Sequence, residues 1–199
     1  MKLPYQITLS ALLPLASVAI ISCSTITPET NIAAKIKPGM PGGEVVQTST
    51  ITAKVTGIDT AKRKVTLVTN DGKKLAVKAG PGVVNFEQIR IGDQLKVSLT
   101  EELVVRMAKP GEKTNDSETG VVQLSPVGAK PGGMMTETYQ TAATVTSIDQ
   151  ANRKATLKMA DGSSHTVAVR QDVDLTKRKV GEKVLIRKTE VLALLMEKP

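Results

Sequence analysis

Apolar and polar residues alternate along two stretches of the chain, roughly residues 50–109 and 140–199. Successive side chains of a strand point to opposite faces of a sheet, so this alternation predicts half-buried β-strands. The first stretch holds five apolar series: Ala53/Val55, Val65/Leu67, Leu75/Val77, Leu95/Val97/Leu99 and Leu103/Val105/Met107. Between them, Asp71-Gly72 supplies the positive φ of a tight hairpin, Gly92 marks a second turn, and Asn85 is placed to cap a short helical turn.

The second stretch repeats the first at an offset of about ninety residues, so the chain is a tandem duplication. Residues 53–59 match residues 143–149, and the hairpin turn recurs as Asp161-Gly162. The match also relates Arg63 to Arg153, Glu101 to Glu190, Met107 to Met196 and the capping residue Asn85 to Asp174.

Five short strands with one hairpin and one helical turn predict a small closed barrel of the OB or SH3-like kind. Closure is expected because a five-stranded open sheet would leave unpaired edges. The sequence thus predicts an all-β chain with two five-stranded barrels in tandem, at residues 50–109 and 140–199. The Thr-, Pro- and Gly-rich segment 23–49 is expected to be a flexible tether. Segment 110–139 is expected to be a linker, in which residues 121–124 add one isolated strand.

The first 22 residues have the pattern of an export signal. Met1-Lys2 is a short positive start, residues 7–21 form a mainly apolar stretch, and Ser22 is a small residue at the expected cleavage point. The apolar stretch is shorter than the ~20 residues that span a bilayer.

Residues 20–23, Ile-Ile-Ser-Cys, resemble the lipobox of bacterial lipoproteins. The resemblance implies cleavage before Cys23, a diacylglyceryl thioether on its sulfur and an acylated amino terminus. Ser24 in the next position implies sorting to the outer membrane, with the protein facing the periplasm. The alternatives are an uncleaved N-terminal anchor and a plain secretory peptide with an unmodified Cys.

The motif order Ala-x-Val-x-x-Ile-Asp, Arg-Lys-x-Thr-Leu, Asp-Gly and Thr-Glu-x-Leu occurs in both repeats. It is similar to that of uncharacterised bacterial envelope proteins that carry one or two small β-barrel domains. This resemblance concerns turns and core positions, so it implies a fold and no activity.

Composition excludes several kinds of chemistry. With one Cys, one His, no Trp and 2% aromatic residues, the chain has no Cys/His zinc cluster, no disulfide framework and too few rings to stack nucleic acid bases. We therefore expect no cofactor and no nucleic acid partner. The net charge of +8 lies on the two repeats and suits either solvated loops or a loose attraction to an anionic glycan.

Glu101 and Glu190 stand out because each occupies an otherwise apolar register. An unpaired buried carboxylate is unfavourable. Three explanations remain open: a functional acid in each repeat, a turn between two strands at Thr100-Glu101, or ion pairs of Glu101 with Arg63 and of Glu190 with Arg153.

The layout is also similar to small periplasmic Cu(I)/Ag(I)-binding barrels of heavy-metal efflux systems, which use His, two Met and a Trp. This resemblance implies Met159, His165 and Met196 as soft ligands. The chain has no Trp, and the first repeat does not mirror Met159 or His165, so core filling by the methionines is the alternative.

His165 is also the sole imidazole, and we expect no catalysis from it. The sequence predicts a lipid-anchored, non-enzymatic envelope protein that acts as a binding or structural adaptor. Its expected partners are membrane lipid through Cys23 and an envelope protein or anionic glycan. The oligomeric state stays open.

Overall fold

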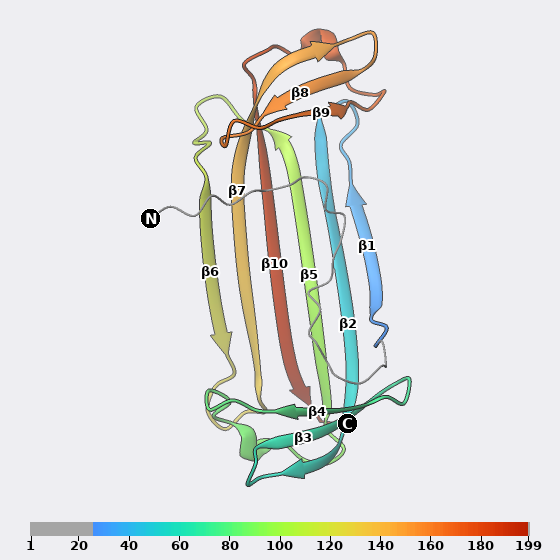
Figure 1. The fold of residues 1–199 in the computed structure, drawn as a ribbon, viewed down its shortest axis with the longest axis vertical. Helices are drawn as coiled ribbons and strands as arrows, with labels where there is room; N and C mark the ends of the chain where they lie inside the picture. The colour runs from blue at the N-terminus through green and yellow to red at the C-terminus, as the bar shows by residue number, and fades with distance from the viewer. Residues whose placement is uncertain (1–25, 199) are drawn as a thin grey trace.

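The computed structural model describes residues 26–198, which form one open antiparallel sheet of ten strands (Figure 1). Its path runs β4-β3-β2-β5-β10-β7-β8-β9, with β1 paired to β2 and β6 paired to β7. The strands are β1 (Glu29–Lys35), β2 (Gly42–Asp59), β3 (Lys64–Thr69), β4 (Lys74–Lys78), β5 (Gln94–Met107), β6 (Ser117–Leu124), β7 (Gly132–Asp149), β8 (Lys154–Lys158), β9 (Ser164–Ala168) and β10 (Lys183–Glu197). Short 3₁₀ turns lie at η1 (Phe86–Gln88) and η2 (Leu175–Lys177). Within the described residues, no helix is long and apolar enough to cross a membrane.

Four long strands organise the molecule. The first half of β2 pairs with β1 and its second half with β3, while β7 divides in the same way between β6 and β8. The result is a central sheet, β1-β2-β5-β10-β7-β6, with the hairpin β3–β4 at one end and β8–β9 at the other (Figure 1). We call these ends the first cap (residues 53–95) and the second cap (residues 143–184).

The all-β class is confirmed, but the sheet is open and two closed tandem barrels are not confirmed. The prediction failed at Thr100-Glu101, where no Gly, Pro or Asn interrupts the alternation and β5 continues through all fourteen residues. β5 and β10 therefore leave their own repeat and cross to the other end. The expected tether and linker also contain strands, namely β1 and β6 and the first residues of β2 and β7.

The turns follow the sequence more closely. Gly72 and Gly162 have positive φ values of 82° and 88° in the two hairpins, as the Asp-Gly pairs predict. Asp174 accepts a hydrogen bond from the backbone N–H of Thr176 and caps η2. Asn85 precedes η1 but makes no capping bond, because its side chain donates instead to the carbonyl of Pro126.

The pairing of β5 with β10 places a local two-fold axis at the centre of the sheet. Glu101 lies directly opposite Glu190, which is its equivalent in the other repeat. Leu99 opposite Leu192 and Leu103 opposite Lys188 are likewise related by exchange of the repeats. The duplication is therefore a symmetry of the fold, and its two halves interlock.

The core of the first cap shows this interlocking. It contains Met196 from the end of β10, packed with residues of the first repeat: Ala53, Val55, Val65, Leu67, Phe86 and Ile89. At the other end, the buried apolar residues are Ala143, Val145, Val173, Leu175, Val184 and Leu185. Each small cap has few buried side chains, and the first cap is completed only by a strand of the other repeat.

Met196→Ala should lower the free energy of unfolding by about 2–4 kcal/mol, because it opens a cavity in the core of the first cap. Met196 is 6% exposed, whereas its neighbour Leu195 is 45% exposed. Leu195→Ala is therefore the matched control and should have an effect of about 1 kcal/mol or less. Urea unfolding measures both variants, and equal effects would contradict the crossing of β10 into the first cap.

Candidate interaction surface

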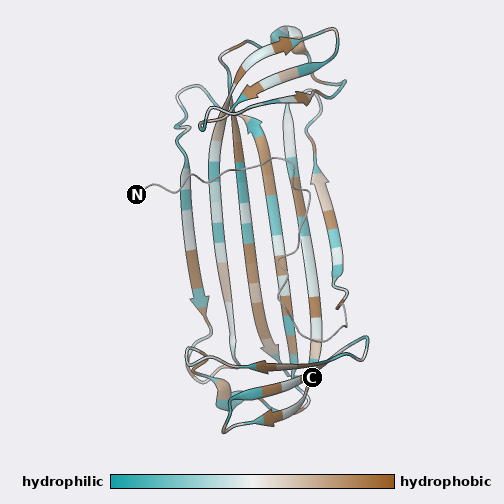
Figure 2. Ribbon diagram, in the orientation of Figure 1, coloured by the Kyte–Doolittle hydropathy of each residue, from teal (hydrophilic) through white to brown (hydrophobic). Residues whose placement is uncertain are grey.

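The central sheet has two different faces. Directly opposite residues of antiparallel strands point to the same side, so the register assigns every side chain to a face. One face, here the glutamate face, carries Glu101, Glu190 and Glu137 in one row across β5, β10 and β7. Figure 2 shows hydrophobic and hydrophilic residues interspersed along the long strands that form both faces.

Large apolar side chains surround this row of carboxylates. Near the centre, Leu99, Leu103 and Val45 are 40–44% exposed. The exposed apolar residues of the glutamate face are Ile32, Val45, Leu99, Leu103, Val122, Leu124, Met135 and Leu194. They remain accessible when residues 26–198 are folded.

The opposite face, here the threonine face, is more polar. Thr48 and Thr100 share a hydrogen bond of 3.0 Å between their hydroxyls, and Thr138 donates to Thr189 at 3.3 Å. Its exposed large apolar residues within the described chain are Val121, Met134 and Leu195. The two faces therefore differ in their apolar content.

Lys188 compensates the opposed carboxylates at the centre. Two like charges directly across a ladder repel each other. The ammonium of Lys188 lies 3.6 Å from Glu101 Oε1 and is also ion-paired with Glu190 Oε1. The Glu190 carboxylate, with Glu101 as a weaker contributor, raises the pKa of Lys188 above its usual value. Tyr139, which lies opposite Lys188 on β7, donates its hydroxyl to Glu137 at 3.0 Å.

Lys188 breaks the symmetry of the duplication. Its equivalent in the first repeat is Leu99, and the equivalent of Glu137 is Gln47. The second repeat thus supplies both the compensating cation and a third carboxylate. The sequence alone assigns Lys188 no role, because its ion-pair partners depend on how the two repeats pair.

The expected ion pairs of Glu101 with Arg63 and of Glu190 with Arg153 do not form among the described residues. The guanidinium of Arg63 donates to the carbonyls of Gly80 and Val83, and it lies 4.8 Å from the centre of the Phe86 ring. Both arginines follow the long strands β2 and β7 and so lie in the caps, whereas the glutamates lie at mid-sheet. The turn expected at Glu101 is also wrong, since β5 is continuous.

The three residues expected to hold a soft metal are separated by the fold. His165 lies on β9 and Met159 in the adjacent turn of the second cap, whereas Met196 is buried in the first cap. The crossing of β10 through the sheet is the reason for the separation. Within residues 26–198, no group of three His, Cys, Asp or Glu side chains is arranged to hold a metal ion.

His165 Nε2 lies 3.4 Å from the hydroxyl of Ser163. That hydroxyl also contacts Asp161 Oδ1 at 2.6 Å, in the same exposed hairpin. In a Ser-His-Asp triad the carboxylate is bonded to the imidazole and orients it. Here the carboxylate of Asp161 contacts the serine instead.

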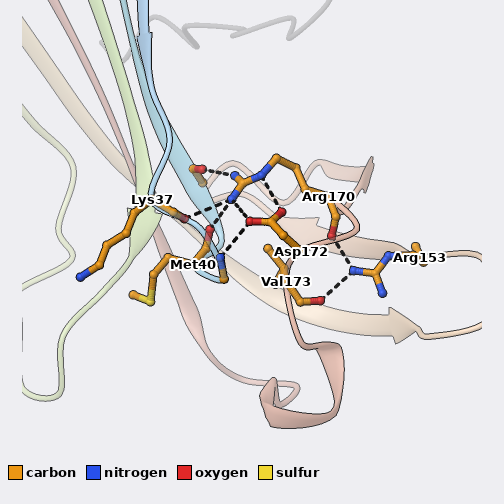
Figure 3. Close-up of polar contacts among 8 residues, drawn as sticks. Lys37, Met40, Arg153, Arg170, Asp172 and Val173 are labelled. Atoms are coloured by element: carbon orange, nitrogen blue, oxygen red, sulfur yellow. Dashed lines mark hydrogen bonds and ion pairs between the residues drawn. The ribbon is translucent and has the colours of Figure 1, made fainter.

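A polar clamp joins the second cap to the first repeat (Figure 3). Arg170 donates to the carbonyls of Lys37 and Met40, in the turn between β1 and β2, and to that of Gly42, the first residue of β2. Asp172 accepts the backbone N–H of Gly39 at 2.8 Å and also contacts Arg170. These bonds fix the end of the central sheet on the second cap.

Arg153, the equivalent of Arg63 in the second repeat, binds the backbone of the segment that carries this clamp. Arg153 has a positive φ of 53°, and its guanidinium donates to the carbonyls of Arg170 and Val173 (Figure 3). In the first cap, Asn85 binds the carbonyl of Pro126 and Asp93 is ion-paired with Lys130. Each cap therefore holds the turn that enters the long strand of the other repeat.

No protein-family model matches the chain, and no curated protein sequence matches it either. Cys23 and the expected signal segment 1–22 lie outside the described residues.

The clamp should make stability depend on pH through Asp172. Its hydrogen bonds with Arg170, and then with the Gly39 N–H, lower the pKa of Asp172 to about 2 from 3.8. The pKa of Asp172 is lower in the folded protein than its value near 3.8 in the unfolded chain. The carboxylate therefore stabilises the fold at pH values above about 3.8, and this stabilisation is lost as the pH falls through about 2. Asp172→Asn should therefore lower the urea midpoint at pH 6, with the difference from wild type shrinking between pH 4 and pH 2. A difference that stays constant over that range would contradict this role.

Proposed function

We propose that the protein is a lipid-anchored, non-enzymatic protein of the bacterial envelope, and that it binds a partner protein through the glutamate face of its central sheet. The observation that carries this proposal is the group of exposed apolar side chains around a carboxylate row, on a sheet whose ends are bonded to the caps. Large contiguous apolar surfaces on a folded chain are typical of interaction sites.

The shape of the site supports binding to an extended surface. The glutamate face spans six strands from β1 to β6, and its apolar side chains occur on every one of them. The caps and their clamps fix both ends of the long strands, so the face is preformed. A preformed site loses little conformational entropy when a partner binds.

The charge of the face favours a basic protein segment. Glu101, Glu190 and Glu137 face a single Lys188, which leaves an excess of negative charge on this surface of a chain with net charge +8. A partner with apolar side chains around a lysine or arginine would complement it. The same charge would repel an anionic glycan, so we favour the protein among the two expected partners.

The proposed anchor would hold the sheet close to the bilayer. Glu29, where β1 begins, comes six positions after Cys23. At ~3.6 Å per extended residue, these six steps span at most about 22 Å. Lipid on Cys23 would therefore keep the edge of the sheet near the outer membrane, instead of at the end of the longer tether expected for residues 23–49. Two or three acyl chains are enough for stable anchoring.

Cys23→Ala should abolish incorporation of radiolabelled palmitate and release the chain from the membrane fraction of the producing bacterium. The lipobox requires the thiol, so Ser24→Ala, one position later, should keep both the label and the membrane association. Equal labelling of the Cys23→Ala chain would contradict the anchor.

Two neighbouring methionines test the glutamate face. Met135 and Met134 are similarly exposed, at 41% and 37%, but they lie on opposite faces of β7. Affinity-tagged full chains are crosslinked in intact cells. The amount of partner crosslinked to the chain should fall at least tenfold with Met135→Lys and stay unchanged with Met134→Lys. Equal urea midpoints would show that both variants fold.

Three outcomes would overturn the proposed binding face. They are loss of the partner in both variants, retention in both, and crosslinking to polysaccharide in place of protein. The anchor experiment is independent of these outcomes, because Met134 and Met135 lie far in sequence from Cys23.

A further inference from the structure

The two outer strands of the central sheet present open edges. Within residues 26–198, β1 pairs only with β2, and β6 pairs only with β7. Every residue of both strands is exposed. An outer strand offers a row of backbone N–H and C=O groups on which a further strand can pair.

These edges lack the features by which soluble proteins usually block them. Proline, bulges and inward or central charges prevent edge pairing in most sheets. β6 has eight residues, no proline and one charge, Glu118, and its register with β7 is unbroken from Ser117 to Leu124. β1 carries its charges only at its two ends, Glu29 and Lys35. By contrast, the protected inner pairs β2–β3 and β7–β8 each contain a bulge.

We propose that β6 of one copy pairs with β1 of a second copy, so that the chain associates edge to edge. All neighbouring strands of the central sheet are antiparallel, so β1 and β6 run in opposite directions. Two copies placed side by side in the same orientation therefore bring β6 against β1 as an antiparallel pair. The glutamate face of one copy then continues into that of the next.

Side-chain matching selects a register for this pairing. Ile32 and Val122 both lie on the glutamate face, and both are exposed. Placing them opposite each other also sets Ala33 against Val121 on the threonine face. Apolar and β-branched cross-strand pairs of this kind stabilise antiparallel sheets.

The pairing uses two different edges, so it does not close after two copies. A head-to-tail contact continues as an open row unless its rotation closes a ring. The inference does not depend on the proposed anchor or on the partner at the glutamate face.

Cysteine crosslinking tests the pairing in the full chain with Cys23→Ala, which removes the natural thiol. One chain carries Ile32→Cys and a second, differently tagged chain carries Val122→Cys. Directly opposite side chains in a sheet lie close enough for a disulfide under mild oxidation. The mixture should give a dimer that contains both tags, and a chain with both substitutions should give a ladder of larger species.

The controls decide which edges meet. Ile32→Cys mixed with Val127→Cys should not crosslink, because Val127 is 92% exposed in the turn after β6 and lies off the edge. Crosslinking of either single variant with itself would show pairing of like edges and would overturn the proposed β6–β1 contact. If no crosslink forms even when the protein concentration is raised 100-fold, self-association is overturned altogether.

A charge on the edge gives a second measurement. Val121→Lys should weaken association at least tenfold in sedimentation velocity, whereas Val127→Lys adds the same charge off the edge and should leave it unchanged. An equal effect of the two substitutions would overturn the assignment to β6. Urea unfolding of both variants would show that the fold is intact.

Discussion

The ladder between β5 and β10 is the contact on which the rest of the structure depends. All fourteen residues of β5 pair with β10, and each strand enters the opposite end of the molecule. As a result, Met196 from the second repeat fills the core of the first cap. The clamps at Arg170 and Asn85 add polar contacts with the same crossed connectivity. Neither repeat is complete without the other, so the two repeats form one interlocked fold.

The same ladder creates an electrostatic conflict at its centre. An exact two-fold pairing of identical repeats must place some residue opposite its own equivalent, and here that residue is Glu101 opposite Glu190. Lys188, which replaces Leu99 of the first repeat, relieves the repulsion by contacting both carboxylates. Divergence of the second repeat at a single position thus makes the symmetric arrangement compatible with two charges.

A sheet of this kind leaves more surface available than a closed barrel of the same length. The small caps bury the apolar residues that stabilise the ends, while the long strands between them keep both faces accessible. One face combines exposed apolar side chains with carboxylates, and two edges expose backbone groups. The proposed binding and self-association would use different parts of this surface, so a row of copies would present one continuous glutamate face.

Local features of the fold were predictable from the sequence, because they depend on neighbouring residues. Alternation predicted strands within residues 50–109 and 140–199 but missed β1 and the first residues of β2 and β7. Asp-Gly pairs predicted the hairpins, and Asp174 capped its helical turn as expected. The isolated strand expected at residues 121–124 is part of β6. For the candidate site, the sequence singled out Glu101 and Glu190 but assigned them the wrong partners.

The sequence by itself determined the all-β class, the duplication and the turns, since these follow from period-two patterns and from backbone preferences of single residues. Only the tertiary structure decided which strands pair across the repeats. Alternation is satisfied equally by a strand that folds back at Thr100-Glu101 and by one that runs on. The choice depends on non-local partners: the β10 ladder, the Met196 core contact and the Lys188 ion pairs. That choice separated Met196 from His165 and brought the two glutamates together.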